Sequence, residues 1–272
     1  MWLGTMGGGL DRLDLMTGDV ERWPPDPSGG AGPPHGDVSS LAWAGDGSLL
    51  LGTEGGGVSR YDPATGRFAT LDIDGAKPSQ AVDVLAVFVD HRGEVWASTE
   101  NDGLHRYDEA AEAFRRFRLP GGDGPLSGDH AWSIIEDRHG RLWVGFTDTG
   151  LARISADRSA ARLYTTDNSQ MHSDRILTLL EGPAGDIWFG TEGAGLGRLD
   201  PRTEQFSAIT MADGLPHNHV EGLLLDGSDR IWISTNDGLA MRDHDGSIVR
   251  FSPGSGLHGR RFYANAMGRT SE

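Results

Sequence analysis

Polar side chains recur at two fixed places in a pattern that repeats along the chain. The first set stands directly before an apolar segment, and its members are Asp37, Asp83, His130, Arg175, His219 and Arg261. The second set follows a recurring Thr or its equivalent, and it runs Met6, Glu54, Glu100, Asp148, Glu192 and Asn236. Carboxylates, imidazoles and guanidinium groups on one surface could bind a polyhydroxylated or zwitterionic small ligand, such as a carbohydrate, or the loops of a partner domain.

Other interpretations of the same residues stay open. The two sets could simply be solvated loop residues, or Asp and His that cap the ends of strands. A divalent cation would suit converging carboxylates and imidazoles, but the chain has no Asp-x-Asp-x-Asp loop and no His-Glu-x-x-His, so we predict no metal. The short pair in His217-Asn218-His219 is typical of polar loop surface. We expect no cofactor either.

Catalysis has little support in the sequence. The chain has no Gly-x-Ser-x-Gly elbow and no Ser-x-x-Lys, so we predict no catalytic residues. The nearest enzymatic alternative is a propeller of the streptogramin-lyase type. There, His130 or His219 would act as acid or base together with Glu100 or Glu192. Because a shared fold is a poor warrant for activity, binding is the preferred prediction.

An internal repeat positions both sets. Its core is a large apolar residue followed by x-Gly/Ser-Thr, as in Trp2-Leu3-Gly4-Thr5 and Trp188-Phe189-Gly190-Thr191, and Trp143-Val144-Gly145-Phe146-Thr147 carries one inserted residue. Six copies begin at residues 2, 50, 96, 143, 188 and 232, so the intervals are 48, 46, 47, 45 and 44 residues. Such even spacing indicates a repeat architecture.

Each repeat reads as four short strands joined by Gly-, Asp- and Pro-rich turns. Four-stranded units of about 40–50 residues predict the blades of an all-β fold, a β-propeller, with six repeats counted and a seven-bladed parent as the alternative. The loop into the inner strand and the loop after the second strand leave a propeller blade on the same face. Both polar sets are therefore expected to surround one mouth of the central channel.

The repeated tryptophans are predicted to be scaffold rather than a sugar-binding surface. They stand at equivalent positions between apolar neighbours, and they are Trp2, Trp96, Trp143, Trp188 and Trp232. The turn glycines, such as Gly55-Gly56-Gly57, are not a phosphate-binding loop, because no helix follows them.

The two ends of the chain look like complementary parts of one blade. Residues 262–272 correspond to the strand and turn that precede the Trp strand elsewhere, and the chain begins at such a Trp strand. We therefore expect N- and C-terminal strands to close a ring, which would remove an exposed sheet edge. Residues 1–272 are predicted to form a single propeller domain, a fragment of a larger sensor protein. The N-terminus does not read as a signal peptide.

Composition narrows the partners. The net charge of −16 argues against nucleic acid and anionic membrane surfaces as partners. The chain has no cysteine, which excludes disulfides and thiol chemistry. No apolar run of 18 residues occurs, so no direct membrane insertion is expected.

The segments Ile134–Gly145, Gly185–Leu196 and Asp213–Val220 resemble the two-component regulator propeller repeat. The resemblance covers nearly the whole chain, although Leu50 replaces the favoured Trp and Phe146 interrupts one motif. In that family the repeats form the periplasmic sensor region of hybrid two-component histidine kinases and of some diguanylate cyclases, ahead of an immunoglobulin-like domain, and some members sense carbohydrate fragments.

The resemblance implies a non-enzymatic, ligand-sensing propeller in the periplasm, taken from a homodimeric parent. Its partners would be a small-molecule ligand and a neighbouring propeller or immunoglobulin-like domain. Alternatively, the propeller would serve as a protein–protein interaction scaffold. The family has no fixed set of binding residues that could be carried over to this chain.

Overall fold

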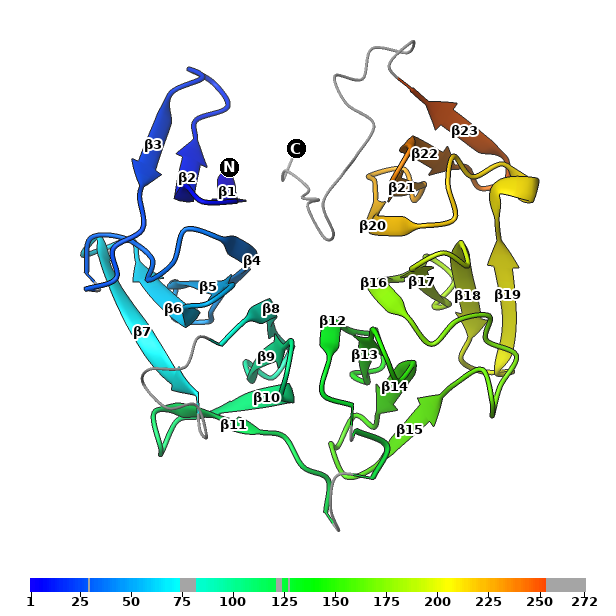
Figure 1. The fold of residues 1–272 in the computed structure, drawn as a ribbon, viewed down its shortest axis with the longest axis horizontal. Helices are drawn as coiled ribbons and strands as arrows, with labels where there is room; N and C mark the ends of the chain where they lie inside the picture. The colour runs from blue at the N-terminus through cyan, green and yellow to red at the C-terminus, as the bar shows by residue number, and fades with distance from the viewer. Residues whose placement is uncertain (29, 74–81, 121–123, 127, 253–272) are drawn as a thin grey trace. The chain divides into compact units, whose positions relative to one another are not determined.

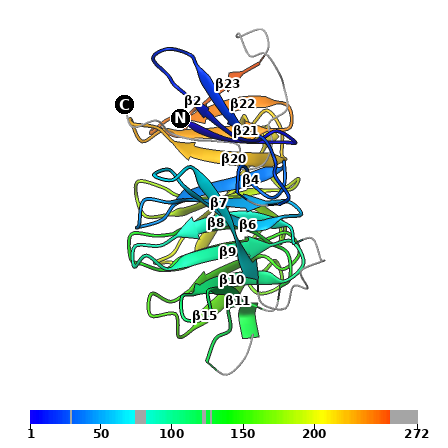
Figure 2. The same cartoon turned by 90° about the vertical axis from the view of Figure 1, so that its left-hand side faces the viewer.

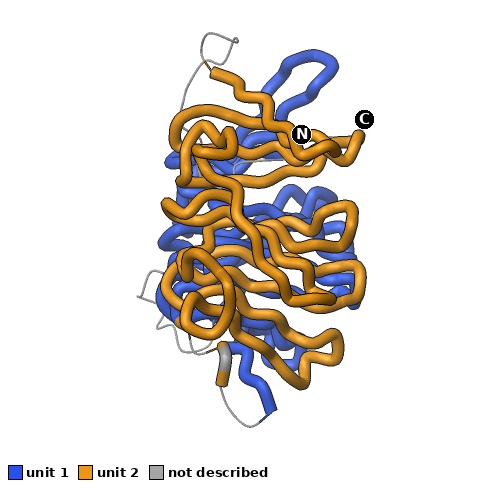
Figure 3. Tube along the Cα trace, turned by 90° about the vertical axis from the view of Figure 1, so that its right-hand side faces the viewer, with its two compact units in different colours: residues 1–123, 129–131 blue, residues 124–128, 132–272 orange. Residues whose placement is uncertain are grey.

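The computed structural model describes residues 1–28, 30–73, 82–120, 124–126 and 128–252. Over these residues it contains 23 β-strands and two single-turn 3-10 helices. The chain divides into two compact units (Figure 3). Unit 1 holds residues 1–123 and 129–131, and unit 2 holds residues 124–128 and 132–272.

Unit 1 contains three successive blades, seen from their outer side in Figure 2. Blade one is a three-stranded sheet of β1 (Trp2–Thr5), β2 (Gly9–Leu13) and β3 (Val20–Trp23). Blade two has β4 (Val38–Trp43), β5 (Leu49–Thr53), β6 (Gly57–Asp62) and β7 (Arg67–Ile73). Blade three has β8 (Val84–Val89), β9 (Val95–Thr99), β10 (Gly103–Asp108) and β11 (Ala113–Arg116).

Blades two and three share a contact that the repeat does not predict. Their outermost strands, β7 and β11, pair in parallel, with Asp72 opposite Ala113 and Ile73 opposite Phe114. The two blades thereby form one continuous eight-stranded sheet. All other strand pairs within the blades of unit 1 are antiparallel, as hairpin connections require.

Unit 2 contains three four-stranded blades (Figure 1). Blade four has β12 (Ala131–Glu136), β13 (Leu142–Phe146), β14 (Leu151–Ile154) and β15 (Ala161–Tyr164). Blade five has β16 (Ile176–Glu181), β17 (Ile187–Thr191), β18 (Leu196–Asp200) and β19 (Gln205–Ile209). Blade six has β20 (Val220–Leu225), β21 (Ile231–Thr235), β22 (Gly238–Arg242) and β23 (Ile248–Phe251). The short helices are η1 (Gly124–Leu126) and η2 (Met211–Asp213).

These sheets confirm the predicted fold class, a β-propeller built from four-stranded blades. Blade one has only three described strands, and within the described ranges no strand pairs with the free edge of β1. The predicted completing strand, residues 262–272, lies outside the described residues, so ring closure stays a prediction.

The tryptophans of the repeat are scaffold, as predicted. Trp96 and Trp143 are fully buried, and Trp188 is 3% exposed. In three blades the indole N–H donates to an aspartate in the turn six residues earlier. The pairs are Trp96 to Asp90 at 3.0 Å, Trp143 to Asp137 at 2.8 Å and Trp232 to Asp226 at 2.9 Å. A buried indole needs such an acceptor, so the aspartate and the tryptophan form one packing unit.

Candidate functional site

A repeated backbone hydrogen bond joins the two predicted polar sets within the blades. The N–H of the second-set residue donates to the carbonyl of the first-set residue of the same blade. It joins Glu54 to Asp37 at 2.9 Å, Glu100 to Asp83 at 3.0 Å, Glu192 to Arg175 at 3.1 Å and Asn236 to His219 at 3.2 Å. The structure thus places the two sets side by side at one end of each of these blades.

A second repeated hydrogen bond links neighbouring blades inside each unit. A glycine after the second strand donates to the residue just before the first set of the next blade. The bonds run from Gly9 to Gly36 at 2.9 Å, Gly57 to Val82 at 3.0 Å and Gly195 to Asn218 at 2.8 Å. The polar residues of adjacent blades therefore follow one another along a rim. We call these the unit 1 rim (Asp37, Glu54, Asp83, Glu100) and the unit 2 rim (Arg175, Glu192, His219, Glu221).

The unit 1 rim is acidic. Burial raises the pKa of Glu54, and the negative charges of Asp37, Asp83 and Glu100 raise it further, while His35 opposes them. His35 Nδ1 lies 3.7 Å from a carboxylate oxygen of Asp37. Like charges crowded on this rim destabilise the ionised form of Glu54, and a cationic group bound there would relieve that repulsion.

The unit 2 rim alternates cationic and anionic groups. Arg175 Nη2 lies 2.5 Å from Glu192 Oε2, and His219 Nε2 lies 3.1 Å from Glu221 Oε1. The backbones of Glu192 and His219 form an isolated antiparallel bridge, which brings the two pairs together. Burial raises the pKa of Glu221, and Glu192 adds to this, whereas His219 lowers it. The rim therefore offers donors and acceptors within a few ångströms, as a polyhydroxylated or zwitterionic ligand needs.

Glu221 is a rim residue that the sequence patterns did not reveal. Four inner strands shift register near their start, so that one residue is extra: Ser39, Leu85, Leu177 and Glu221. A β-bulge re-aims the side chain of its extra residue. The available signal was the charge itself, since Glu221 occupies the second place of an otherwise apolar inner strand.

Other predicted residues do not join these clusters. Asp148 is exposed, and its carboxylate accepts a hydrogen bond from the hydroxyl of the adjacent Thr149 at 2.6 Å. Met6 is 59% exposed. His130 is half-buried beside Asp129 in unit 1. Asn236 reaches the rim through its backbone bond to His219, whereas Arg261 lies outside the described residues.

Replacing Glu54 with Gln is expected to raise thermal stability at neutral pH. The raised pKa means that folded Glu54 binds more protons than the unfolded residue, so its ionisation lowers stability as the pH rises above its ordinary value of 4.5. Burial and the neighbouring carboxylates both oppose the ionised form of this partly exposed residue, so we expect a gain of about 1 kcal/mol or less. Melting curves of E54Q and the parent should separate at pH 7 and converge near pH 4. A constant gap at both pH values would contradict this explanation.

Among residues 1–28, 30–73, 82–120, 124–126 and 128–252, no three His, Asp or Glu side chains converge as metal ligands would. Within the same ranges no helix has the length and apolar character needed to cross a bilayer.

A family model and a sequence relative each match part of this chain. A family model described as two component regulator propeller matches residues 125–148. A histidine kinase P4 of Formosa agariphila is 24% identical over 196 residues, which cover 68% of this chain and 14% of that protein.

Solved structures share the fold. The extracellular domain of a protein described as a hybrid two-component system from B. thetaiotaomicron superposes with a TM-score of 0.71 at 17% identity, over 97% of this chain and 34% of that one. Virginiamycin B lyase from Staphylococcus aureus superposes with a TM-score of 0.68 at 14% identity, over 90% of this chain and 78% of that one. The chain thus spans only a minor part of the two signalling relatives.

Proposed function

Because this chain carries the two-component regulator propeller repeat, we propose that it is a ligand-sensing β-propeller from the extracytoplasmic, periplasmic part of a bacterial two-component signalling protein. In this proposal the chain itself catalyses no reaction. The parent, a homodimeric sensor histidine kinase or diguanylate cyclase, would supply the output. The similarity to a histidine kinase and to an extracellular two-component domain supports the assignment.

The observation that carries the proposal is the unit 2 rim. Two ion pairs, Arg175–Glu192 and His219–Glu221, stand together on adjacent blades, and each keeps polar atoms exposed to solvent. Side-chain exposure ranges from 13% for Glu221 to 58% for Arg175. Partly buried, mutually oriented charges of this kind are preorganised for a small ligand whose hydroxyl, amine or carboxylate groups can replace water.

A thermal-shift screen with sugars, oligosaccharides and amines tests the proposal. A ligand that binds only the folded state raises the melting temperature. At a hundred times its Kd it adds about 2.7 kcal/mol to the free energy of unfolding. H219A should abolish any shift found, because His219 holds Glu221 on the unit 2 rim. H244A is the matched control, since His244 is exposed on a turn away from the rims. A shift that survives in H219A would remove the unit 2 rim from the site.

The same residues could instead dock a protein domain. The partner would be a neighbouring propeller or an immunoglobulin-like domain of the parent, and the rim charges would fix its orientation rather than supply most of its affinity. Pull-down by the adjoining domain, weakened in H219A, would favour this scaffold function over small-molecule sensing.

A lyase function is the second candidate, and one observation favours it. His219 and Glu221 form a hydrogen-bonded pair at 3.1 Å on the rim, in a fold shared with virginiamycin B lyase. Such a pair can exchange a proton with a bound substrate. Incubation with a cyclic-ester antibiotic decides the matter, and an unchanged antibiotic would eliminate this candidate.

A further inference from the structure

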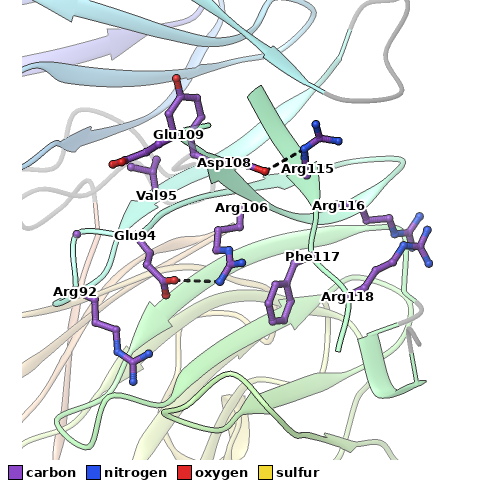
Figure 4. Close-up of a pocket in the computed structure, with 12 residues that line it drawn as sticks. Arg92, Glu94, Val95, Arg106, Asp108, Glu109, Arg115, Arg116, Phe117 and Arg118 are labelled. Atoms are coloured by element: carbon purple, nitrogen blue, oxygen red, sulfur yellow. Dashed lines mark hydrogen bonds and ion pairs between the residues drawn. The ribbon is translucent and has the colours of Figure 1, made fainter. Parts of the chain in front are cut away.

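A second, strongly basic recess lies on the flank of blade three and shares no residue with either rim. It has a volume of about 630 Å³, within the range of sites for small organic ligands. Its walls come from the β8–β9 turn, the end of β10 and the strand β11 with the residues after it (Figure 4). The charged lining residues are Arg92, Arg106, Arg115, Arg116, Arg118, Glu94, Asp108 and Glu109.

The recess is cationic in a chain that is otherwise acidic. Five arginines face three carboxylate side chains in the lining, whereas the whole chain carries 24 basic and 40 acidic residues. The run Phe114–Arg118 supplies three of those arginines within four positions, a density found nowhere else in the sequence. A surface of net charge −16 repels anions generally, so a local excess of positive charge is where an anion would settle.

Aromatic rings hold the central guanidinium in place. Arg106 Cζ lies 5.8 Å from the ring of Trp96 and 5.7 Å from that of Phe117, and these two rings meet edge to face at 5.0 Å. Glu94 Oε1 accepts from Arg106 Nη1 at 3.0 Å. A guanidinium fixed in this way loses little freedom on binding, and stacking leaves its edge available.

The ion pairs inside the recess do not use up its donors. Arg115 Nε lies 3.2 Å from Asp108, and Arg116 reaches out to Asp102 and Asp129. Each guanidinium has five N–H donors and no acceptor, so a paired arginine still presents donors to a second oxyanion. In Figure 4 the side chains of Arg116 and Arg118 are drawn on the same side of Arg106.

We propose that this recess binds a small organic oxyanion carrying at least two phosphate, sulfate or carboxylate groups. The planar fork of arginine fits these groups in a bidentate manner, and several arginines around one cavity select a multiply charged ligand over a single carboxylate. This site goes beyond the sensing function proposed for the rims. Because the recess shares no residue with them, a negative result at one site leaves the other proposal unaffected.

Isothermal titration at fixed ionic strength tests the site with two probes, inorganic pyrophosphate and citrate. Their relative affinities distinguish phosphoryl from carboxylate ligands. We expect saturable binding of at least one probe at one site per chain. R92S combined with R118S should weaken it at least tenfold, because each change removes charge-assisted hydrogen bonds. R106Q should weaken it as well, provided that its melting curve shows an intact fold.

R22S combined with R67S is the matched control. Both residues are exposed in unit 1, and the substitution removes the same charge from the chain. Binding should change less than twofold. An equal loss in this control would show that only net charge matters, and would overturn the site. So would the absence of saturable binding with both probes.

Discussion

Replacing Asp137 with Ala is expected to lower the free energy of unfolding by about 3 kcal/mol. The residue is 4% exposed, and its carboxylate accepts from the indole of Trp143 at 2.8 Å. It also accepts from the backbone N–H of His139 and Arg141 and from Arg141 Nε at 2.6 Å. The substitution leaves the indole and the turn amides without their acceptor. Each buried donor without a partner costs about 1–3 kcal/mol. Urea unfolding followed by tryptophan fluorescence measures the loss.

The pH dependence of this effect has a definite sign. Burial alone would raise the pKa of Asp137, but the hydrogen bonds from Trp143 and Arg141 hold it below its ordinary value of 3.8. Because the folded state binds the proton less readily, Asp137 stabilises the fold above that value, and this contribution is lost as the pH falls through the lowered pKa. The difference between parent and D137A should be constant above about pH 5 and shrink in stronger acid.

Asp62 provides the control for Asp137. It caps an exposed turn, accepting from Ala64 and Thr65 at 2.8 Å each, and no indole depends on it. D62A should therefore change stability far less than D137A. Equal losses in the two variants would mean that the turn, and not the buried indole pair, is what Asp137 stabilises.

The spacing of these aspartates is visible in the sequence, but only the structure shows that they accept hydrogen bonds from the indoles. Asp precedes Trp by six residues at 90–96, 137–143 and 226–232, and the blade with Leu50 has Ala44 in the aspartate place. Blade five breaks the rule with Gly182. There the Asp186 carboxylate lies 2.5 Å from where a Cβ of residue 182 would stand, and Trp188 Nε1 has no hydrogen-bond partner in the described structure.

The even repeat was sufficient to predict blades, because each copy must bury one apolar face against the next. It could not predict the parallel pairing of β7 with β11, which depends on how far one outer strand extends. The repeat also predicted that the two polar sets lie next to each other. The ion pairs of the unit 2 rim depend on side-chain directions, and a single-residue bulge at Glu221 sets one of them. Alternation along a strand misassigns such a residue.

The glycine of the repeat motif is explained by close approach between blades. A Cβ on Gly190 would lie 2.5 Å from Thr178 Cγ2 and 2.8 Å from the carbonyl oxygen of Val220. Gly145 would meet Ile176 of the next blade at 2.6 Å in the same way. The third position of the motif therefore sets how closely an inner strand can pack on its neighbour.

Replacing Gly190 with Ala is accordingly expected to lower the free energy of unfolding by about 2 kcal/mol, since overpacking a filled core costs roughly 1–3 kcal/mol. The added methyl would meet a backbone oxygen, which cannot rotate away as a side chain can. Urea unfolding again measures the loss. G45A is the control: Gly45 has no atom within 4 Å of an added Cβ, so stability should stay level or rise slightly. The added methyl would push on β20 at Val220, which lies between His219 and Glu221. G190A should therefore also weaken binding of any ligand at the unit 2 rim, whereas G45A should leave that binding unchanged. A destabilised G190A protein with full ligand affinity would place that ligand elsewhere.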